Sequence, residues 1–311
     1  MIRQQVRIGT RASKLALAQA GAMRAVIAAG LDGGLEAAPL IHITTTGDRI
    51  QDRPLTELGG KALFTKEIEE ALLIGRIDCA VHSLKDMPAL SPPGLVIAAI
   101  PEREDARDAF LSVKFASLDA LPRGARLGTA SLRRAAQALH RRPDLNIVPL
   151  RGNVDSRIAK LERGEADAII LAAAGLNRLG LGHLAKTLID PGEAPPAPGQ
   201  GALAIQTRAE DAQAPWLAGL RHPATTLAAA AERGALEALE GSCRTAVGAW
   251  ARIDGAALRL TVEALTPDGA RRFRREGEVA AAAGEAAARE LGLRLGAEIR
   301  DEGGAALLAQ G

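Results

Sequence analysis

The chain contains two internally similar segments, and this repeat limits the folds open to it more than any other feature. The motif RIGT at 7–10 leads into the helical pattern ALAQA, and RLGT at 126–129 leads into AAQAL. Further along each segment, LLIGRIDCAVHS at 72–83 corresponds to LERGEADAIILA at 161–172. Both predict a helix that ends at a glycine able to adopt positive φ, and an Asp just before a buried strand. The pattern therefore predicts two halves built from similar βα units.

The order of predicted elements indicates an α/β fold, because β-type apolar runs alternate with Ala/Leu-rich helical stretches. We expect the short run ALAIQT, after the Pro-rich segment 191–198, to return to the first half. A long helix at 224–239, the strands GAWARI and LRLTVEAL, and a final helix from about Val279 predict a small α+β module. The predicted domains are 1–101 with 200–222, then 102–199, then 223–311, and the charged segment 101–108 is interpreted as a hinge.

Composition excludes several function classes. The 311 residues include two Trp, four Phe and no Tyr, too few rings for stacking along single-stranded nucleic acid or sugars. The formal charge of +2 gives no overall field for a polyanion, so we expect no nucleic-acid partner. Two cysteines without a CxxC or Cys/His cluster predict neither a disulfide framework nor a metal site. No signal-peptide core and no run of eighteen apolar residues occur, so we expect a cytoplasmic protein without a membrane contact.

Each repeat places hydroxyl and cationic side chains where a strand leads into a helix. Helix N-termini present free N–H groups, and ligands of α/β domains bind beyond the carboxyl ends of the strands. A Ser or Thr before a helix is by default only an N-cap, but cations in the first turn oppose the helix dipole and favour an anion site. The residues concerned are Thr10, Arg11, Ser13 and Lys14 in the first repeat and Thr129, Ser131, Arg133 and Arg134 in the second.

Basic residues concentrate between 121 and 160, where nine Lys and Arg face only Asp144 and Asp155, a net of +7. Arg151 follows an apolar strand, and Arg157 lies in the next helix, which Asn153 is suited to cap. Guanidinium groups bind carboxylate or phosphate through two parallel hydrogen bonds. The cluster therefore predicts a ligand with several acidic groups.

Three further positions have both a structural and a functional interpretation. Asp86 follows a buried strand beside Lys85 and is either a turn cap or a functional carboxylate. Cys243 lies in a Gly-containing loop beside Arg244, which favours a thiolate, although a lone Cys is ordinarily a small buried hydrophobe. The polar segment 48–61 is either a lid or an ordinary exposed loop. Cys79 and His82, within a predicted strand, are interpreted as structural.

These motifs together resemble the porphobilinogen deaminase (hydroxymethylbilane synthase) family over nearly the whole chain. The resemblance rests on motifs in the family's order: IGTRASKLALAQA, GGKALFTKEIEEALL, DCAVHSLKDMP, EREDARDAF, GTASLRRAAQ, RRPDLNIVPLRGNVDSRI, AIILAAAGLNRLG, PGQGALAI and LEGSCRTAVG. Four positions depart from the family pattern: Lys14 in place of Pro, Ala62 in place of Gly, Ala130 where Ser is common, and Ser242 where Gly is frequent. None changes a catalytic residue type, and Ala62 is expected to stiffen the lid hinge.

The resemblance implies a transferase that joins four porphobilinogen molecules head to tail with loss of ammonia and releases hydroxymethylbilane. It implies two similar domains like periplasmic binding proteins that face a cleft, a small C-terminal α+β domain, and a monomer. The implied cofactor is a dipyrromethane held as a thioether by Cys243, with Asp86 as general acid and base. The implied cofactor contacts are Lys85, Ser83, Thr129, Ser131, Arg133, Arg134 and Gln200. The implied contacts to substrate and growing chain are Arg11, Ser13, Gln19, Arg151, Arg157 and Arg178.

The alternative is a two-lobed anion-binding protein without catalysis. It accounts equally well for the Gly-Thr turns and the Arg cluster. It does not account for an Asp after Lys85 at a strand end or for a loop Cys in a third domain. The sequence therefore favours the enzyme.

Overall fold

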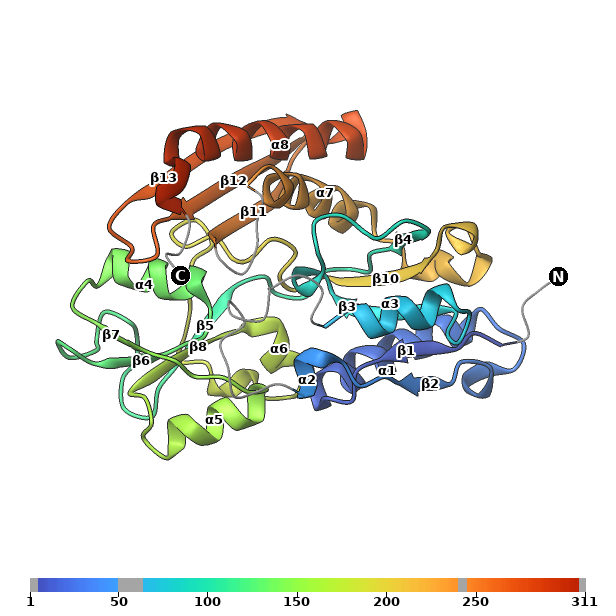
Figure 1. Ribbon diagram of the computed structural model, residues 1–311, viewed down its shortest axis with the longest axis horizontal. Coiled ribbons are helices and arrows are strands. Elements are labelled where there is room, and N and C mark those ends of the chain that lie inside the picture. The colour runs from blue at the N-terminus through green and yellow to red at the C-terminus, as the bar shows by residue number, and fades with distance from the viewer. Residues whose placement is uncertain (1–4, 50–63, 240–244, 308–311) are drawn as a thin grey trace. The chain divides into compact units, whose positions relative to one another are not determined.

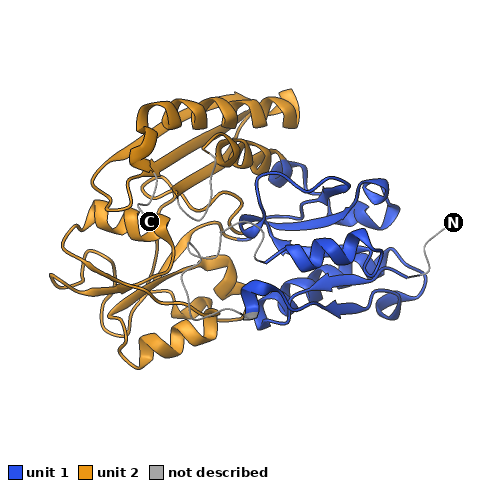
Figure 2. Ribbon diagram, in the orientation of Figure 1, with its two compact units in different colours: residues 1–52, 62–104, 202–226 blue, residues 53–61, 105–201, 227–311 orange. Residues whose placement is uncertain are grey.

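The computed structural model describes residues 5–49, 64–239 and 245–307, and these form two compact units. The first comprises 1–52, 62–104 and 202–226, and the second comprises 53–61, 105–201 and 227–311 (Figure 2). The α/β class predicted from the sequence is confirmed. The second unit contains both the second repeat and the C-terminal segment, so the three-domain division stays a prediction.

The first unit is built on a five-stranded sheet with the order β2-β1-β3-β10-β4 (Figure 1). The strands β1, β2 and β3 are parallel, and β10 runs antiparallel to β3 and β4. The run ALAIQT thus returns to the first half, as predicted. The elements are β1 (Ile8–Thr10), α1 (Lys14–Ala29), β2 (Leu40–His42), α2 (Thr46–Arg49), α3 (Lys66–Leu73), β3 (Cys79–Ser83), β4 (Leu95–Ala99) and β10 (Leu203–Arg208).

The second unit contains a sheet of matching topology, with the order β7-β6-β8-β5-β9. Its strands β6, β7 and β8 are parallel, and β5 is antiparallel to β8 and β9. The side chains of β8 alternate between the two faces, because Ile170 packs in one apolar cluster and Ile169 in the other. The elements are β5 (Asp108–Leu111), β6 (Arg126–Gly128), α4 (Leu132–Arg141), β7 (Asn146–Val148), α5 (Val154–Glu162), β8 (Ala168–Ala172), α6 (Ala173–Arg178) and β9 (Thr187–Leu188).

The internal repeat appears in the structure as one repeated ion pair. Arg7, at the start of β1, donates from its backbone N–H and its guanidinium to Asp78. Arg126, at the start of β6, makes the same contacts with Asp167. The glycines that end the preceding helical turns, Gly75 and Gly164, have φ of +72° and +74°. The two repeated motifs of each half are therefore bound directly to each other, which explains why they recur together.

The C-terminal segment forms a three-stranded antiparallel sheet with the order β11-β12-β13, covered by α7 and α8 (Figure 1). The predicted long helix is confirmed as α7, but the final helix does not begin at Val279. Residues 272–280 form an edge strand instead, which the sequence interpretation missed because Phe273 is its one buried side chain. The elements are α7 (Pro223–Ala238), β11 (Ala246–Asp254), β12 (Ala257–Leu265), β13 (Arg272–Ala280) and α8 (Gly284–Gly303).

Candidate active site

In the first unit, the predicted anion site at the start of α1 is organised by local hydrogen bonds. Ser13 caps α1, since its hydroxyl accepts a hydrogen bond from the backbone N–H of Ala16 at 3.3 Å. The hydroxyl of Thr10, at the end of β1, is fully buried and lies within hydrogen-bond distance of the carbonyl oxygens of Arg11 and Ala16, to one of which it donates. These contacts fix the backbone that carries Arg11.

The guanidinium of Arg11 is held from two sides. Its Nη2 and Nε bond Asp48, the shortest distance being 2.5 Å, and its central carbon lies 4.3 Å from the ring centroid of Phe64. Partial burial alone would raise the pKa of Asp48, but the hydrogen bonds and charge of Arg11 outweigh it and hold that pKa below its ordinary value. Of the predicted lid segment 48–61, residues 50–61 lie outside the described residues.

Strand β3 ends in the segment that contains the proposed acid and base. Gln19 of α1 donates from Nε2 to the hydroxyl of Ser83 at 3.1 Å, so two predicted site residues lie together. A short 3₁₀ helix, Leu84–Asp86, follows and is anchored by the buried side chains of Leu84 and Met87. Lys85 is half-buried and Asp86 is exposed. The fold therefore presents the Asp86 carboxylate to solvent on a backbone fixed at both ends.

In the interior of β3, His82 is structural, as predicted. Its Nε2 lies 3.1 Å from Oε1 of Gln206, and Gln206 donates in turn to Glu69 on α3. Burial lowers the pKa of His82 to about 4, with Gln206 opposing and the Arg11 charge adding to the shift. The ring is thus neutral and donates from Nε2. Cys79 is fully buried in the same strand.

In the second unit, Arg133 and Arg134 converge on one buried carboxylate, that of Asp108 at the start of β5. Arg133 Nη1 lies 2.7 Å from Oδ2, and Arg134 Nη2 lies 2.7 Å from Oδ1. Gln200 donates to the same Oδ1 at 2.9 Å and to the carbonyl oxygen of Ala106. Three predicted cofactor contacts therefore surround an acidic residue that sequence reasoning had placed in a hinge.

Burial and the neighbouring charges shift the pKa values of the residues in this cluster. Burial alone would raise the pKa of Asp108, but the two guanidinium charges outweigh it and hold that pKa far below its ordinary value. Burial lowers the pKa of Arg133. All three guanidinium nitrogens of Arg134 bond within the unit, whereas Nε of Arg133 is buried with no hydrogen-bond partner among the described residues. Arg133 therefore retains a donor for a ligand.

Arg151 and Arg157 lie around the start of α5, whose N-cap is Asn153, as predicted. Nε of Arg157 donates to the carbonyl oxygen of Gly152 at 2.7 Å. The Nη1 atom of Arg151 is buried and, within the described parts of the chain, has no partner. Arg178, at the end of α6, donates to the carbonyl oxygen of Gly201 at 2.7 Å.

The remaining predicted residues of this unit lie at the carboxyl end of β6 and before β11. Thr129 is buried and its hydroxyl accepts from the N–H of Ser131, which caps α4. The hydroxyl of Thr245 is buried without a partner among the residues described here. Cys243, two positions earlier, lies outside the described residues, as does the departure at Ser242.

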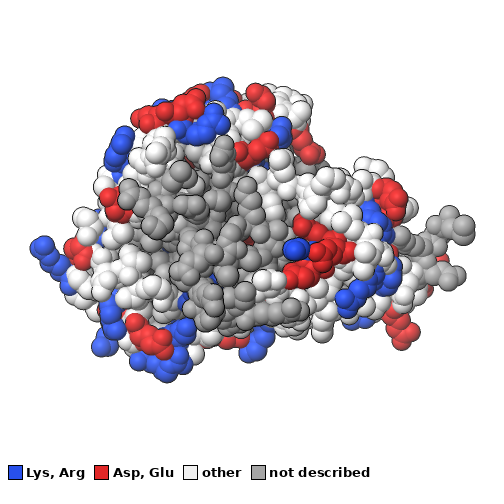
Figure 3. Space-filling view, in the orientation of Figure 1, with Lys and Arg blue, Asp and Glu red and all other residues white. Residues whose placement is uncertain are grey.

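The net charge counted between 121 and 160 overstates the charge available to a ligand. At least five of the nine cations pair with acids: Arg126 with Asp167, Arg133 and Arg134 with Asp108, Arg141 with Asp119 and Glu193, and Arg142 with Asp144. All of these acids except Asp144 lie outside that window. On the face shown in Figure 3, basic and acidic side chains likewise lie next to one another in small groups. The donors of Arg133 and Arg151 are more specific evidence than the charge count.

Sequence reasoning missed Asp108, Gln137 and Glu232. Gln137 lies one turn after Arg133 on α4 and bonds it, and Glu232 on α7 accepts from the N–H groups of Gly199 and Ala251. The sequence did contain a signal for Asp108, because this residue is the first of the apolar run DAFL, and such a run predicts a strand. Gln137 and Glu232 lacked a signal, because their partners are distant in sequence.

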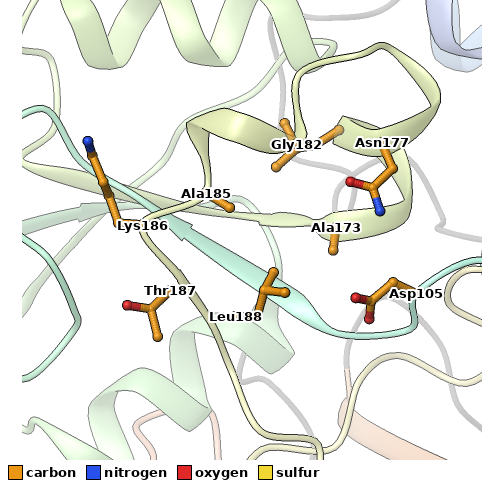
Figure 4. A pocket seen from close by; sticks show the side chains of 9 residues that line it. Asp105, Ala173, Asn177, Gly182, Ala185, Lys186, Thr187 and Leu188 are labelled. Carbon is orange, nitrogen blue, oxygen red and sulfur yellow. The ribbon is translucent and has the colours of Figure 1, made fainter.

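A separate pocket of about 220 Å³ lies between α6 and β9 in the second unit. Asp105, Asn177 and Lys186 line it, but Lys186 extends away from the other lining side chains (Figure 4). Asp105 is already bound to Arg107. None of the predicted site residues lines this pocket.

None of the described helices is both long and apolar enough to cross a membrane.

Comparisons with known proteins agree with the motif assignment. The model "Porphobilinogen deaminase, dipyromethane cofactor binding domain" matches residues 6–215, and "Porphobilinogen deaminase, C-terminal domain" matches 226–301. The solved structure of the methionine-binding protein MetQ is 15% identical, with a TM-score of 0.45 over 70% of this chain and 89% of that one.

Proteins named porphobilinogen deaminase are similar over most of their length. That of Caulobacter sp. (strain K31) is 68% identical and covers 99% of both chains. Those of Phenylobacterium zucineum and Paracoccus denitrificans are 63% and 51% identical, covering 97% and 85% of this chain and 98% and 85% of their own. These matches favour the enzyme over the non-catalytic alternative. With two family models spanning nearly all of its length, the chain belongs to the porphobilinogen deaminase family.

Proposed function

We propose that this chain joins four porphobilinogen molecules head to tail, with loss of ammonia, to give hydroxymethylbilane, and that the residues assigned above perform this reaction. The observation that carries the assignment is the pair of buried guanidinium nitrogens, Nε of Arg133 and Nη1 of Arg151, that lack partners among the described residues. An unpaired buried donor costs free energy, and a carboxylate removes that cost through a charge-assisted hydrogen bond. Porphobilinogen and the pyrrole units derived from it carry acetate and propionate groups.

The donors of the second unit fit the dipyrromethane cofactor. Its carboxylates are the groups that an Arg, Ser and Thr donor set binds. When bound, the cofactor supplies the pyrrole to which the first substrate is joined. We assign its covalent attachment to Cys243 and its carboxylates to Arg133 and Arg134, with Lys85, Ser83, Thr129, Ser131 and Gln200 as further contacts. Arg134 and Gln200 also bond Asp108, so in addition to contacting the cofactor they hold the cluster in place.

We assign the carboxylates of the substrate and growing chain to a second group of residues. Arg151 carries a buried donor that lacks a partner among the described residues, and Arg157 and Arg178 are fixed by bonds to main-chain carbonyl oxygens. The guanidinium of Arg11 is paired with the carboxylate of Asp48. A substrate carboxylate is able to take the place of Asp48 on Arg11, because both groups are anionic hydrogen-bond acceptors. The contacts so assigned are Arg11, Ser13, Gln19, Arg151, Arg157 and Arg178.

We assign the proton transfers to Asp86. Its carboxylate is exposed at the end of β3, on a backbone fixed by the buried Leu84 and Met87. A carboxyl group at this position is able to donate a proton to the departing amine and, once ionised, to stabilise adjacent positive charge. His82 is buried and bonded to Gln206, so it is not the base.

We also propose that the enzyme acts in the cytoplasm as a monomer. Both the location and the monomer are what the resemblance to the family implies. Sedimentation of the purified chain tests the monomer directly, and a dimer at micromolar concentration would contradict it.

The proposed function is tested by following ammonia release from porphobilinogen. The native chain is expected to release ammonia and form hydroxymethylbilane. Asp86→Asn is expected to lose nearly all activity with an unchanged melting temperature, because an exposed carboxylate contributes little to stability. Asp32→Asn, an exposed acid in the same unit, is the matched control and is expected to retain activity. Ammonia release by Asp86→Asn near the native rate would refute the role of Asp86.

A further inference from the structure

The C-terminal sheet contains a buried carboxylate that the proposed reaction does not use. Glu263 lies near the carboxyl end of β12, opposite Gly248 of β11 and Arg274 of β13. Its side chain is 2% exposed. A Glu buried to this degree is uncommon unless it is paired, so its contacts need an explanation.

Glu263 is connected to Arg133 through one intervening side chain, Gln137 of α4. Nε2 of Gln137 donates to Oε1 of Glu263 at 3.0 Å and to the carbonyl oxygen of Pro195 at 2.9 Å. Its amide oxygen accepts from Nη1 of Arg133 at 2.9 Å. Both amide hydrogens of Gln137 thus point at acceptors and its oxygen points at a cation. Glu263 helps fix this orientation, because a flipped amide would direct its NH₂ group at the guanidinium.

The backbone around Glu263 is shaped to bring these groups together. A Cβ atom on Gly248 would lie 2.5 Å from the carbonyl oxygen of Pro195, so only glycine allows this approach. Ala249 donates from its N–H to the carbonyl oxygen of Pro196 at 2.9 Å. The Pro195 oxygen accepts from Arg133 as well as from Gln137. Sheet, proline segment and α4 therefore meet at this point.

The buried carboxylate of Glu263 is not expected to stabilise the fold. Its Oε2 has no hydrogen-bond partner in the described structure, and the nearest cations, Arg272 and Arg274, are each 3.9 Å away. Burial raises its pKa, against the opposing effects of Gln137, the two arginines and His140. A protein with a buried carboxylate that has one oxygen without a hydrogen bond is generally less stable than the same protein with an apolar residue of similar size at that position.

We propose that Glu263 is a positioning residue for the cofactor: through Gln137 it orients the guanidinium of Arg133 so that Nε is left for a cofactor carboxylate. Asp108 and the Pro195 oxygen hold Nη1 of Arg133 from other directions. Only the Gln137 link depends on Glu263. The inference rests on the proposed function, since it concerns how Arg133 receives that group.

The test measures cofactor loading and stability separately. The full-length chain is prepared without cofactor from cells that cannot make porphobilinogen. Loading after addition of porphobilinogen is then followed by intact mass, and melting temperature is measured on the unloaded chain. The variants are Glu263→Leu, Glu263→Gln, Gln137→Leu and the double variant Glu263→Leu/Gln137→Leu. The matched control is Glu276→Gln, an exposed acid that also pairs with Arg274 but does not contact Gln137.

Glu263→Leu is expected to slow loading about tenfold, the effect of losing one charge-assisted hydrogen bond in the link. Its melting temperature is expected to equal or exceed the native value, because a buried charge has been removed. Gln137→Leu is expected to slow loading to the same extent, and the double variant no further, since both changes break one link. Glu263→Gln keeps an acceptor for Gln137 and is expected to load within about twofold of the native rate. Glu276→Gln is expected to load normally.

Native-rate loading by Glu263→Leu would overturn the inference, as would a double variant whose loss is the product of the two single losses. Equal slowing in Glu276→Gln would overturn it too. If Glu263→Leu does not fold, Gln137→Leu tests the same link from its other end. Native-rate loading by Gln137→Leu would then overturn the inference. A native chain that never gains the adduct would instead refute the proposed function.

Discussion

Arg134 binds Asp108 through two of its nitrogens, with Nη2 at 2.7 Å and Nε at 3.1 Å from Oδ1. Both side chains are at most 7% exposed, so the pair is shielded from water. The same carboxylate receives Arg133 on its other oxygen. The start of β5 is thereby bound to the first turns of α4, the helix that supplies the proposed cofactor contacts.

Asp108→Asn is expected to destabilise the protein by about 3–5 kcal/mol, because it leaves two buried guanidinium groups without their counter-charge. Chemical denaturation of the unloaded chain measures this change. The control is Asp105→Asn, which removes the partner of the more exposed Arg107 and is expected to cost less than about 1 kcal/mol. Equal losses in the two variants would contradict the structural role given to Asp108.

His82 is expected to make stability depend on pH. Its pKa in the folded chain is about 4, below the ordinary 6.5, so between these values the unfolded chain takes up a proton that the folded chain does not. Stability is therefore fully present above pH 6.5 and falls as the pH decreases toward 4. Melting temperatures of His82→Gln are expected to vary less over this window than those of the native chain. The exposed His183→Gln is the control and is expected to follow the native curve.

Arg151→Leu and Arg157→Leu are expected to impair extension of the growing pyrrole chain more than addition of the first substrate. The reason is that both residues are assigned to binding the carboxylates of the substrate and of the growing product. The ratio of ammonia released to hydroxymethylbilane formed in the first turnover measures this. It is expected to be four for the native chain and higher for the variants. Arg163→Leu, which removes an exposed cation paired with Glu165, is the control. Native ratios and rates in both variants would show that neither arginine serves extension.

Much of the fold was predictable because local sequence patterns determine it. The repeated Gly and Asp positions predicted two similar halves, and within each half the structure binds the two repeated motifs to each other, through Arg7–Asp78 in the first and Arg126–Asp167 in the second. Strand β13 was not predictable from periodicity, since five of its nine residues are Arg or Glu and Phe273 is its one buried side chain. Its place is set by pairing with β12, which is a tertiary effect.

The types of residue in the site were predictable, but the ion pairs and hydrogen bonds between them were not. Sequence indicated that Arg133 and Arg134 form an anion site, yet not that Asp108 would bind both. The contacts of Glu232 and Glu263 were hidden for the same reason, because their partners lie on elements far apart in sequence. A charge count within a sequence window cannot include such partners.

The most direct test of the central claim is the intact mass of the purified full-length chain. The account predicts a mass above that of the polypeptide by a two-pyrrole adduct, and predicts that Cys243→Ser lacks the adduct and releases no ammonia from porphobilinogen. Serine retains the size but not the thiolate needed for the thioether. A native chain of unmodified mass that leaves porphobilinogen unconsumed, or a Cys243→Ser variant that still carries the adduct, would contradict it.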